Sequence, residues 1–141
     1  MIHIADRHVA LVERCSREAR PLEYCAAMLG LVDDEAAVIK RIVRTRNADT
    51  RMHRFAIPDA EMRRCRALGD ELQLALIALY HSHSNNPPSL SDADRVSLTQ
   101  CPYHWVIGGF NSDDELELAG FEAETGRPIS LTPTCDPYRT V

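Results

Sequence analysis

Residues 72–94 read LQLALIALYHSHSNNPPSLSDAD, and this stretch decides the fold. Its first part, 72–80, is an uninterrupted apolar run bounded by polar and turn-forming sequence, which predicts a strand covered on both faces. His81 and His83 follow directly where this run ends. Side chains two residues apart on a strand share a face and repeat every ~6.6 Å, so the two imidazoles can converge on one ion.

The segment that leads from the histidines to Asp94 has the composition of a loop, with two asparagines and two adjacent prolines. Such a loop can turn the chain back and bring Asp94 to the same ion. Two imidazoles and a carboxylate suit zinc, and three protein ligands leave a fourth position for water, as in a catalytic zinc site. The stretch from Ser91 to Asp94 also fits a capping box at the start of a helix, a local interpretation of nearly equal weight.

A glutamate earlier in the chain can serve as a base beside such an ion. Glu23 lies in PLEYCAAMLG, residues 21–30, directly before a short apolar run. Pro21 is expected to end the preceding helix, because proline cannot continue the hydrogen-bond ladder and disfavours helical geometry in the residue before it. Glu23 is therefore predicted at a junction between a helix and a strand.

The early P-x-E-x-x pattern at residues 21–25, with Ala26 in the next position, is followed by H-x-H-x(7)-S-x-x-D. Together the two patterns resemble the JAMM metallopeptidases, also called MPN-plus domains, and most closely their compact bacterial members. The resemblance covers most of the chain. It implies that Glu23 is general base and acid, that His81, His83 and Asp94 bind one zinc ion per chain, and that Ser91 helps to stabilise the tetrahedral intermediate.

The same resemblance implies the reaction and the partner. The reaction is hydrolysis of a peptide or isopeptide bond at the C-terminal tail of a ubiquitin-fold protein, and in a compact bacterial member that partner looks most like a small sulfur-carrier protein. Two alternatives stay open, namely a non-catalytic MPN scaffold or binding module and a JAMM peptidase of bacterial defence signalling. A nucleobase deaminase is disfavoured, because H-x-E with P-C-x-x-C is absent.

Two positions depart from the family pattern. Ala26 stands where the family usually has glycine, and Ser84 stands where a proline commonly follows the second histidine. Neither departure removes a chemical group. We therefore expect them to affect the rate or the fit of the substrate more than the type of reaction.

Length and composition limit the classes of protein to which the chain can belong. The 141 residues are expected to form one domain over 1–141. The formal net charge of −5, from 21 acidic and 16 basic residues, gives no support to nucleic-acid binding. The five cysteines lack any C-x-x-C pair, which argues against a disulfide framework and a cysteine-bound zinc. Without a secretory segment or an apolar run long enough to cross a membrane, a cytoplasmic protein is expected.

Hydrophobic patterning predicts a mixed α/β protein with a central sheet flanked by helices. The family resemblance implies the same architecture, an MPN-type, cytidine-deaminase-like arrangement of three layers. Besides the strands already described, strands are predicted at 2–4, 36–46, 53–57, 105–110, 116–122 and 129–132, and helices at 8–19, from 59 to a stop at Gly69, and at 91–100. Arginines at 41, 44, 46, 51 and 54 form either a cationic patch or, more simply, a charged sheet edge.

Overall fold

The computed structural model describes residues 1–34, 36–48, 57–84 and 86–134. Within these ranges the elements, in chain order, are β1 (Ile2–Ala5), α1 (Asp6–Ala19), β2 (Cys25–Val32), β3 (Ala37–Thr45), α2 (Asp59–Leu72), β4 (Ala75–His83), α3 (Asp92–Leu98), β5 (His104–Phe110), β6 (Leu116–Phe121), β7 (Pro128–Ile129) and β8 (Leu131–Thr134). The strand predicted at 53–57 lies almost wholly outside the described residues.

The strands form one mixed sheet in the order β7-β6-β5-β4-β2-β3-β1-β8. β4 lies in the middle, antiparallel to β2 and parallel to β5. Its burial pattern is continuous from Ile77 to His83, as expected for a strand covered on both faces. The apolar run at 72–80 thus predicted the central strand, but Leu72 belongs to α2, and the strand begins at Ala75 and extends through both histidines.

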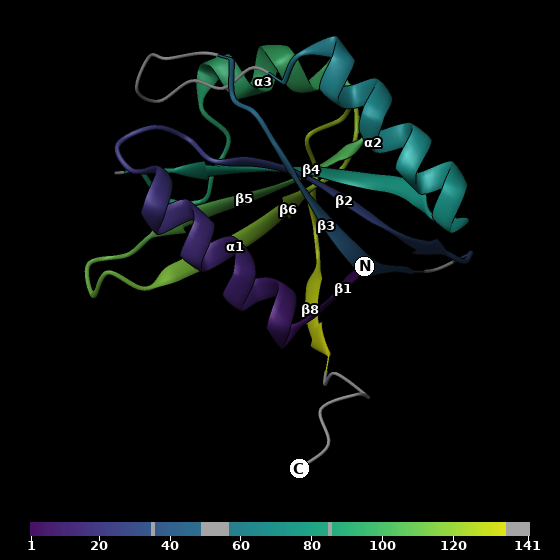
Figure 1. The fold of residues 1–141 in the computed structure, drawn as a ribbon. Coiled ribbons are helices and arrows are strands. Elements are labelled where there is room, and N and C mark those ends of the chain that lie inside the picture. The colour runs from purple at the N-terminus through teal and green to yellow at the C-terminus, as the bar shows by residue number, and fades with distance from the viewer. Residues whose placement is uncertain (35, 49–56, 85, 135–141) are drawn as a thin grey trace.

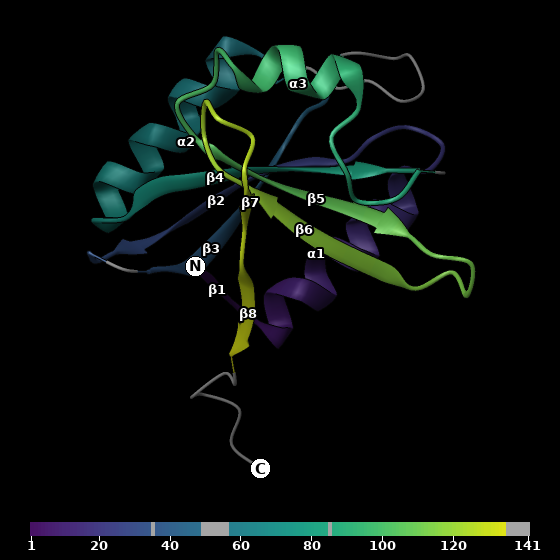
Figure 2. The same cartoon turned by 180° about the vertical axis from the view of Figure 1, so that it is seen from behind.

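Helices cover both faces of the sheet (Figures 1 and 2). α1 packs on one face over a cluster that includes Val12, Met28 and Tyr80. α2 and α3 pack on the other face over a second cluster, which includes Leu79, Leu98 and Trp105. The alternation of side chains along β4 separates the two clusters, since Leu79 and Tyr80 point to opposite faces. The predicted mixed sheet between helical layers is confirmed.

The end of α2 differs from the prediction. The helix continues past Gly69 to Leu72 and closes at Gln73, which has a left-handed φ of 57°. Gly69 is needed for a different reason, because a Cβ there would lie 2.7 Å from the carbonyl oxygen of Leu74. The backbone N–H of Leu74 donates to the Gly69 carbonyl at 2.8 Å, so the glycine permits the chain to return closely against the helix.

The strand predicted at 129–132 is also divided. Ile129 belongs to β7, which pairs with β6, whereas Leu131 belongs to β8, which pairs with β1. These two strands stand at opposite ends of the strand order, and only Ser130 separates them in the chain. The carbonyl of Ser130 accepts from the N–H of Ile2 at 2.8 Å. The sheet therefore curls until its two ends meet at Ser130.

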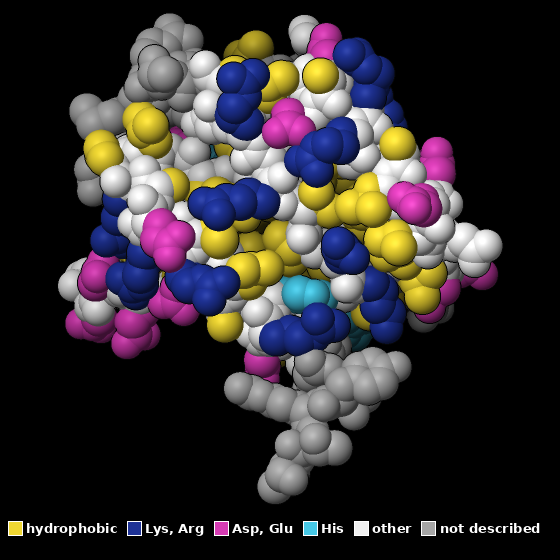
Figure 3. Space-filling model, viewed as in Figure 1, with side chains coloured by type: hydrophobic (Ala, Val, Ile, Leu, Met, Phe, Trp, Pro, Cys, Tyr) yellow, Lys and Arg dark blue, Asp and Glu magenta, His cyan; other side chains and the backbone are white. Residues whose placement is uncertain are grey.

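The arginines of β3 lie along an edge with little strand cover. β1 pairs with β3 only at Ala37 and Val38, so the described residues leave the rest of that side of β3 without a neighbouring strand. Arg41, Arg44 and Arg46 are exposed, and Lys and Arg side chains gather over the face on which α1 and β3 lie (Figure 3). Arg51 and Arg54 lie outside the described residues. The arrangement agrees with a charged sheet edge.

In the part of the chain that the structure describes, no helix has the length and apolar character that crossing a bilayer requires.

Candidate metal centre

Glu23 sits where α1 gives way to β2. α1 ends at Ala19, as the proline at position 21 predicted, and β2 begins at Cys25. The side chain of Glu23 is almost completely buried, with 2% relative exposure. Its carbonyl oxygen accepts a hydrogen bond of 2.9 Å from the side-chain amide of Asn47, which follows β3. The carboxylate is thus held at the end of the sheet and not in solvent.

The two histidines are the first and third of the last three residues of β4. His81 is directly opposite Cys25 of β2, and both imidazoles are buried. Their ring centroids lie 5.1 Å apart. The predicted convergence of the two rings on one face is therefore present in the structure.

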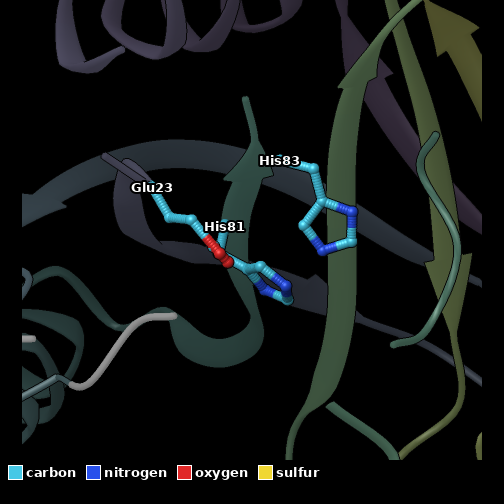
Figure 4. A group of neighbouring side chains, drawn as sticks. All are labelled: Glu23, His81 and His83. Atoms are coloured by element: carbon cyan, nitrogen blue, oxygen red, sulfur yellow. The ribbon is translucent and has the colours of Figure 1, made fainter. Parts of the chain in front are cut away.

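A carboxylate joins this pair of histidines. Potential ligand atoms of Glu23, His81 and His83 all lie within 4.8 Å of one another, and Figure 4 shows the Glu23 carboxylate reaching toward His81. The cluster unites residues that are far apart in the sequence. Three buried groups with nitrogen and oxygen donors so close together could hold a metal ion.

Asp94 reaches the histidines from the first turn of α3. Its Oδ1 lies 3.3 Å from Nε2 of His81, and its Oδ2 lies 3.2 Å from Nε2 of His83. Oδ2 also accepts from the backbone N–H of Ser91 at 3.0 Å, and the Ser91 hydroxyl accepts from the N–H of Asp94 at 3.1 Å. The capping box and the approach to the histidines are therefore both present, and the capping box fixes the direction of the Asp94 side chain.

Burial and this carboxylate together determine the electrostatics of the site. Burial alone would raise the pKa of Asp94, but hydrogen bonds and charge from His81 and His83, with the Ser91 N–H, lower it well below the usual value. Burial lowers the pKa of His81. For His83 burial acts in the same direction, but hydrogen bonds to Asp94 and to the Pro87 carbonyl outweigh it and raise the pKa. Asp94 is thus ionised between two imidazoles.

The donor set fits a cation. Nδ1 of His83 lies 2.9 Å from the carbonyl oxygen of Pro87, and a carbonyl can only accept, so this nitrogen carries the proton. In the neutral ring, Nε2 then directs a lone pair at Asp94. A lone pair and a carboxylate oxygen attract each other only through a proton or a cation between them. A ring nitrogen oriented by a hydrogen bond on its opposite side is typical of histidines that bind metals.

Neighbouring side chains hold the histidines in place. The indole of Trp105 meets the ring of His81 edge-on, with centroids 5.1 Å apart and planes at 87°. Cys25, beside His81, is fully buried, and burial raises the pKa of its thiol.

Two residues of the site were not identified from the sequence. Ser82, between the histidines, accepts from the backbone N–H of Tyr24 through its hydroxyl at 2.8 Å. Asn47 holds the carbonyl of Glu23. For Ser82 the only available signal was its position between two candidate ligands, and for Asn47 there was none, because its contact joins segments that are distant in the sequence.

The two departures from the family pattern are accommodated. Ala26 is fully buried in the cluster beneath α1, where its methyl group adds to the apolar packing. Ser84 is also buried, and its hydroxyl has no hydrogen-bond partner among the described residues.

The fold and the grouped donors define a class of protein, the JAB/MPN domains. The model of the family described as prokaryotic homologs of the JAB domain, Prok-JAB, matches residues 5–119. The match spans most of the chain, and the chain belongs to this family. No curated protein matches the chain.

Solved structures share the fold at low sequence identity. A protein from Desulfitobacterium hafniense has a TM-score of 0.87 and 17% identity, with 96% of this chain and 94% of that chain covered. A JAB1/MPN domain protein from Archaeoglobus fulgidus has a TM-score of 0.62 and 15% identity, with 95% and 97% covered. The structure described as "JAMM: A Metalloprotease-like Zinc Site in the Proteasome and Signalosome" has a TM-score of 0.57 and 13% identity, with 95% and 98% covered. The fold is that of the JAMM/MPN domains.

Proposed function

We propose that the protein is a zinc-dependent metallopeptidase of the JAMM type. It would hydrolyse a peptide or isopeptide bond at the C-terminal tail of a ubiquitin-fold, sulfur-carrier-like protein. The observation that carries this proposal is the convergence of buried Glu23, His81 and His83 with Asp94 at the end of β4. Membership of the Prok-JAB family supports it, as does the fold shared with a structure described as a metalloprotease-like zinc site.

In this proposal His81, His83 and Asp94 hold the ion through two imidazole nitrogens and a carboxylate oxygen, a ligand set that zinc accepts. Bound zinc supplies Lewis acidity, which polarises a carbonyl group and lowers the pKa of a water molecule. The hydrogen bond from His83 to Pro87 and the capping box at Ser91 orient two of the three ligands before an ion arrives. The site is thus organised by its own side chains.

Glu23 would carry the proton. Its buried carboxylate takes a proton from the attacking water as the new C–O bond forms, and it gives a proton to the departing amine as the C–N bond breaks. The oxygen of the Ser91 hydroxyl accepts from the N–H of Asp94, which leaves its own O–H to donate to the developing oxyanion. These roles require no residue outside the described site.

We also propose that the reaction takes place in the cytoplasm. The described cysteines at 15, 25, 65 and 101 are free thiols, which fits a reducing compartment.

The test compares wild type with Glu23→Gln and His83→Ala, each purified without added metal. We expect about one zinc per chain in wild type and in Glu23→Gln, and little in His83→Ala, by elemental analysis. Hydrolysis is measured with a ubiquitin-fold protein that carries a fluorescent amine on a Gly-Gly tail. Turnover of Glu23→Gln should fall by ~10²–10⁴, the range typical of general acid–base catalysis. Glu18→Gln, an exposed site on α1, is the matched control.

The outcomes separate the proposal from a scaffold function. Zinc in wild type with hydrolysis that depends on Glu23 supports the peptidase. Full zinc content in His83→Ala would mean that the ligands are wrongly assigned. Wild type that neither holds zinc nor binds it on soaking would instead favour a non-catalytic binding module.

A further inference from the structure

The peptide group between Glu23 and Tyr24 lies just beyond the paired part of the sheet. β2 begins at Cys25, which is opposite Thr45 of β3 on one side and His81 of β4 on the other. The preceding peptide group is therefore outside both regular ladders. It is nevertheless buried, since Glu23 is 2% and Tyr24 5% exposed. A buried peptide group outside a ladder must find other partners for its C=O and N–H.

Two side chains supply those partners. The amide of Asn47 donates to the carbonyl oxygen of Glu23 at 2.9 Å, and the hydroxyl of Ser82 accepts from the N–H of Tyr24 at 2.8 Å. Both polar groups of one peptide plane are thus held by side chains from two different strand ends. The N–H of Ser82 also donates to the Tyr24 carbonyl at 3.0 Å, which ties the same two residues a second time.

We propose that Asn47 and Ser82 are positioning residues that clamp the Glu23–Tyr24 peptide and so orient the Glu23 carboxylate toward the metal ligands. This inference rests on the proposed function. The orientation of the peptide plane sets the direction in which the Glu23 side chain leaves the backbone. Because a displacement of about 1 Å can cost ~10²-fold in rate, a small rotation of this plane matters for proton transfer.

The position of Ser82 connects the backbone of Glu23 to the strand that carries the two histidines. Ser82 lies between His81 and His83, and its side chain alternates with theirs along β4. The two histidines therefore place candidate ligands on one face of β4, while Ser82 between them holds the backbone next to Glu23. A shift of β4 would therefore move Glu23 and the two histidines together, and the distances between them would be preserved.

Loss of either contact removes a hydrogen bond from a buried polar group, which favours rotation of the peptide toward another partner or toward water. The ligands themselves are unchanged, because neither Asn47 nor Ser82 contributes an atom to the metal site. Variants that lose either contact are therefore expected to keep their metal content and to lose the placement of Glu23.

The experiment uses full-length Ser82→Ala and Asn47→Ala, with Ser84→Ala as the matched control. Ser84 is also a buried serine at the end of β4, but its hydroxyl has no hydrogen-bond partner among the described residues. Zinc content is expected to stay near the wild-type value in all three variants. Hydrogen exchange of the Tyr24 amide, measured by NMR, should accelerate at least tenfold in Ser82→Ala and stay within twofold of wild type in Ser84→Ala.

Turnover of the fluorescent Gly-Gly probe should fall ~10- to 100-fold in Ser82→Ala and Asn47→Ala, chiefly in kcat. In a Glu23→Gln background, the same substitutions should cause almost no further loss, because they act through Glu23. Equal fold-losses in both backgrounds would overturn the inference. Asn47 is only partly buried, so Asn47→Ala keeps the test available if Ser82→Ala does not fold.

A readout without catalysis separates this inference from the proposed function. The pKa of the Glu23 carboxyl group is measured by carbon NMR in the zinc-loaded proteins. We expect it to change in Ser82→Ala and Asn47→Ala and to match wild type in Ser84→Ala. If wild type is inactive but these changes occur, the clamp stands and the peptidase function fails. An unchanged Glu23 titration together with unchanged Tyr24 exchange would refute the clamp.

Discussion

Asp94 has two structural tasks within one carboxylate. Its Oδ2 accepts from the N–H of Ser91 and also faces His83, while Oδ1 faces His81. The start of α3 and the candidate metal centre therefore depend on the same side chain. A substitution at this position affects helix capping and metal binding together, and a suitable pair of variants can separate the two.

Asp94→Asn keeps the shape and an oxygen that can accept from Ser91, whereas Asp94→Ala removes both the charge and the acceptor. We expect both variants to lose most of their zinc. In metal-free protein only Asp94→Ala loses the acceptor for the N–H of Ser91, which is one half of the capping box, and this costs about 1 kcal/mol in the free energy of unfolding. Denaturant titration with a chelator measures the second effect. Asp92→Asn, exposed in the same turn, should keep its zinc; loss of zinc there would implicate helix charge in place of ligation.

At the level of elements, the side chain of Tyr80 on β4 reaches Gly108 on β5 and leaves no room for a side chain there. A Cβ at this position would lie 2.1 Å from the hydroxyl oxygen of Tyr80. That hydroxyl is fully buried and is 2.8 Å from the hydroxyl of Ser16 on α1. One contact thus connects β5, β4 and α1, and the glycine leaves room for it.

We predict that Gly108→Ala lowers the free energy of unfolding by ~1–3 kcal/mol, the usual cost of overpacking. Tyr80→Phe removes the obstructing oxygen and one hydrogen bond, so the double variant should lose less than the sum of the two single variants. Denaturant unfolding of all four proteins measures the coupling. Strictly additive losses would show that the added methyl group does not meet the Tyr80 hydroxyl.

Elements with a strong local pattern were predictable from the sequence, and long-range contacts were not. The apolar run before His81 predicted β4, and Pro21 predicted the end of α1, because each signal acts within a few residues. Gly69 misled the prediction of the helix end, because its role is set by the returning backbone of Leu74. The site followed the same rule, since the spacing of its polar residues indicated the cluster but could not indicate the contacts of Ser82 and Asn47.

For the whole molecule, the candidate metal centre joins three parts of the chain. Glu23 precedes β2, the histidines end β4, and Asp94 opens α3. An ion bound only by the folded arrangement stabilises the fold by mass action, because the unfolded chain does not bring these groups together.

We predict that zinc at about 100 times its Kd raises the free energy of unfolding by ~2.7 kcal/mol, which raises Tm. Thermal unfolding with zinc and with a chelator measures the shift. His83→Ala should show little zinc-dependent change. A shift of equal size in that variant would mean that zinc acts at another place on the protein.

The meeting of the sheet ends at Ser130 has a consequence for biosynthesis. β1 leaves the ribosome long before β8, which is one of its two neighbours, and β3 covers only two residues of β1. At ~5–20 residues per second, the ribosome reaches β8 on the order of 10 s after it has made β1. During that interval the first strand has an open edge on which a strand from another nascent chain can pair. Completion of residues 131–134 ends this exposure, so a strand that is made late protects one that is made early.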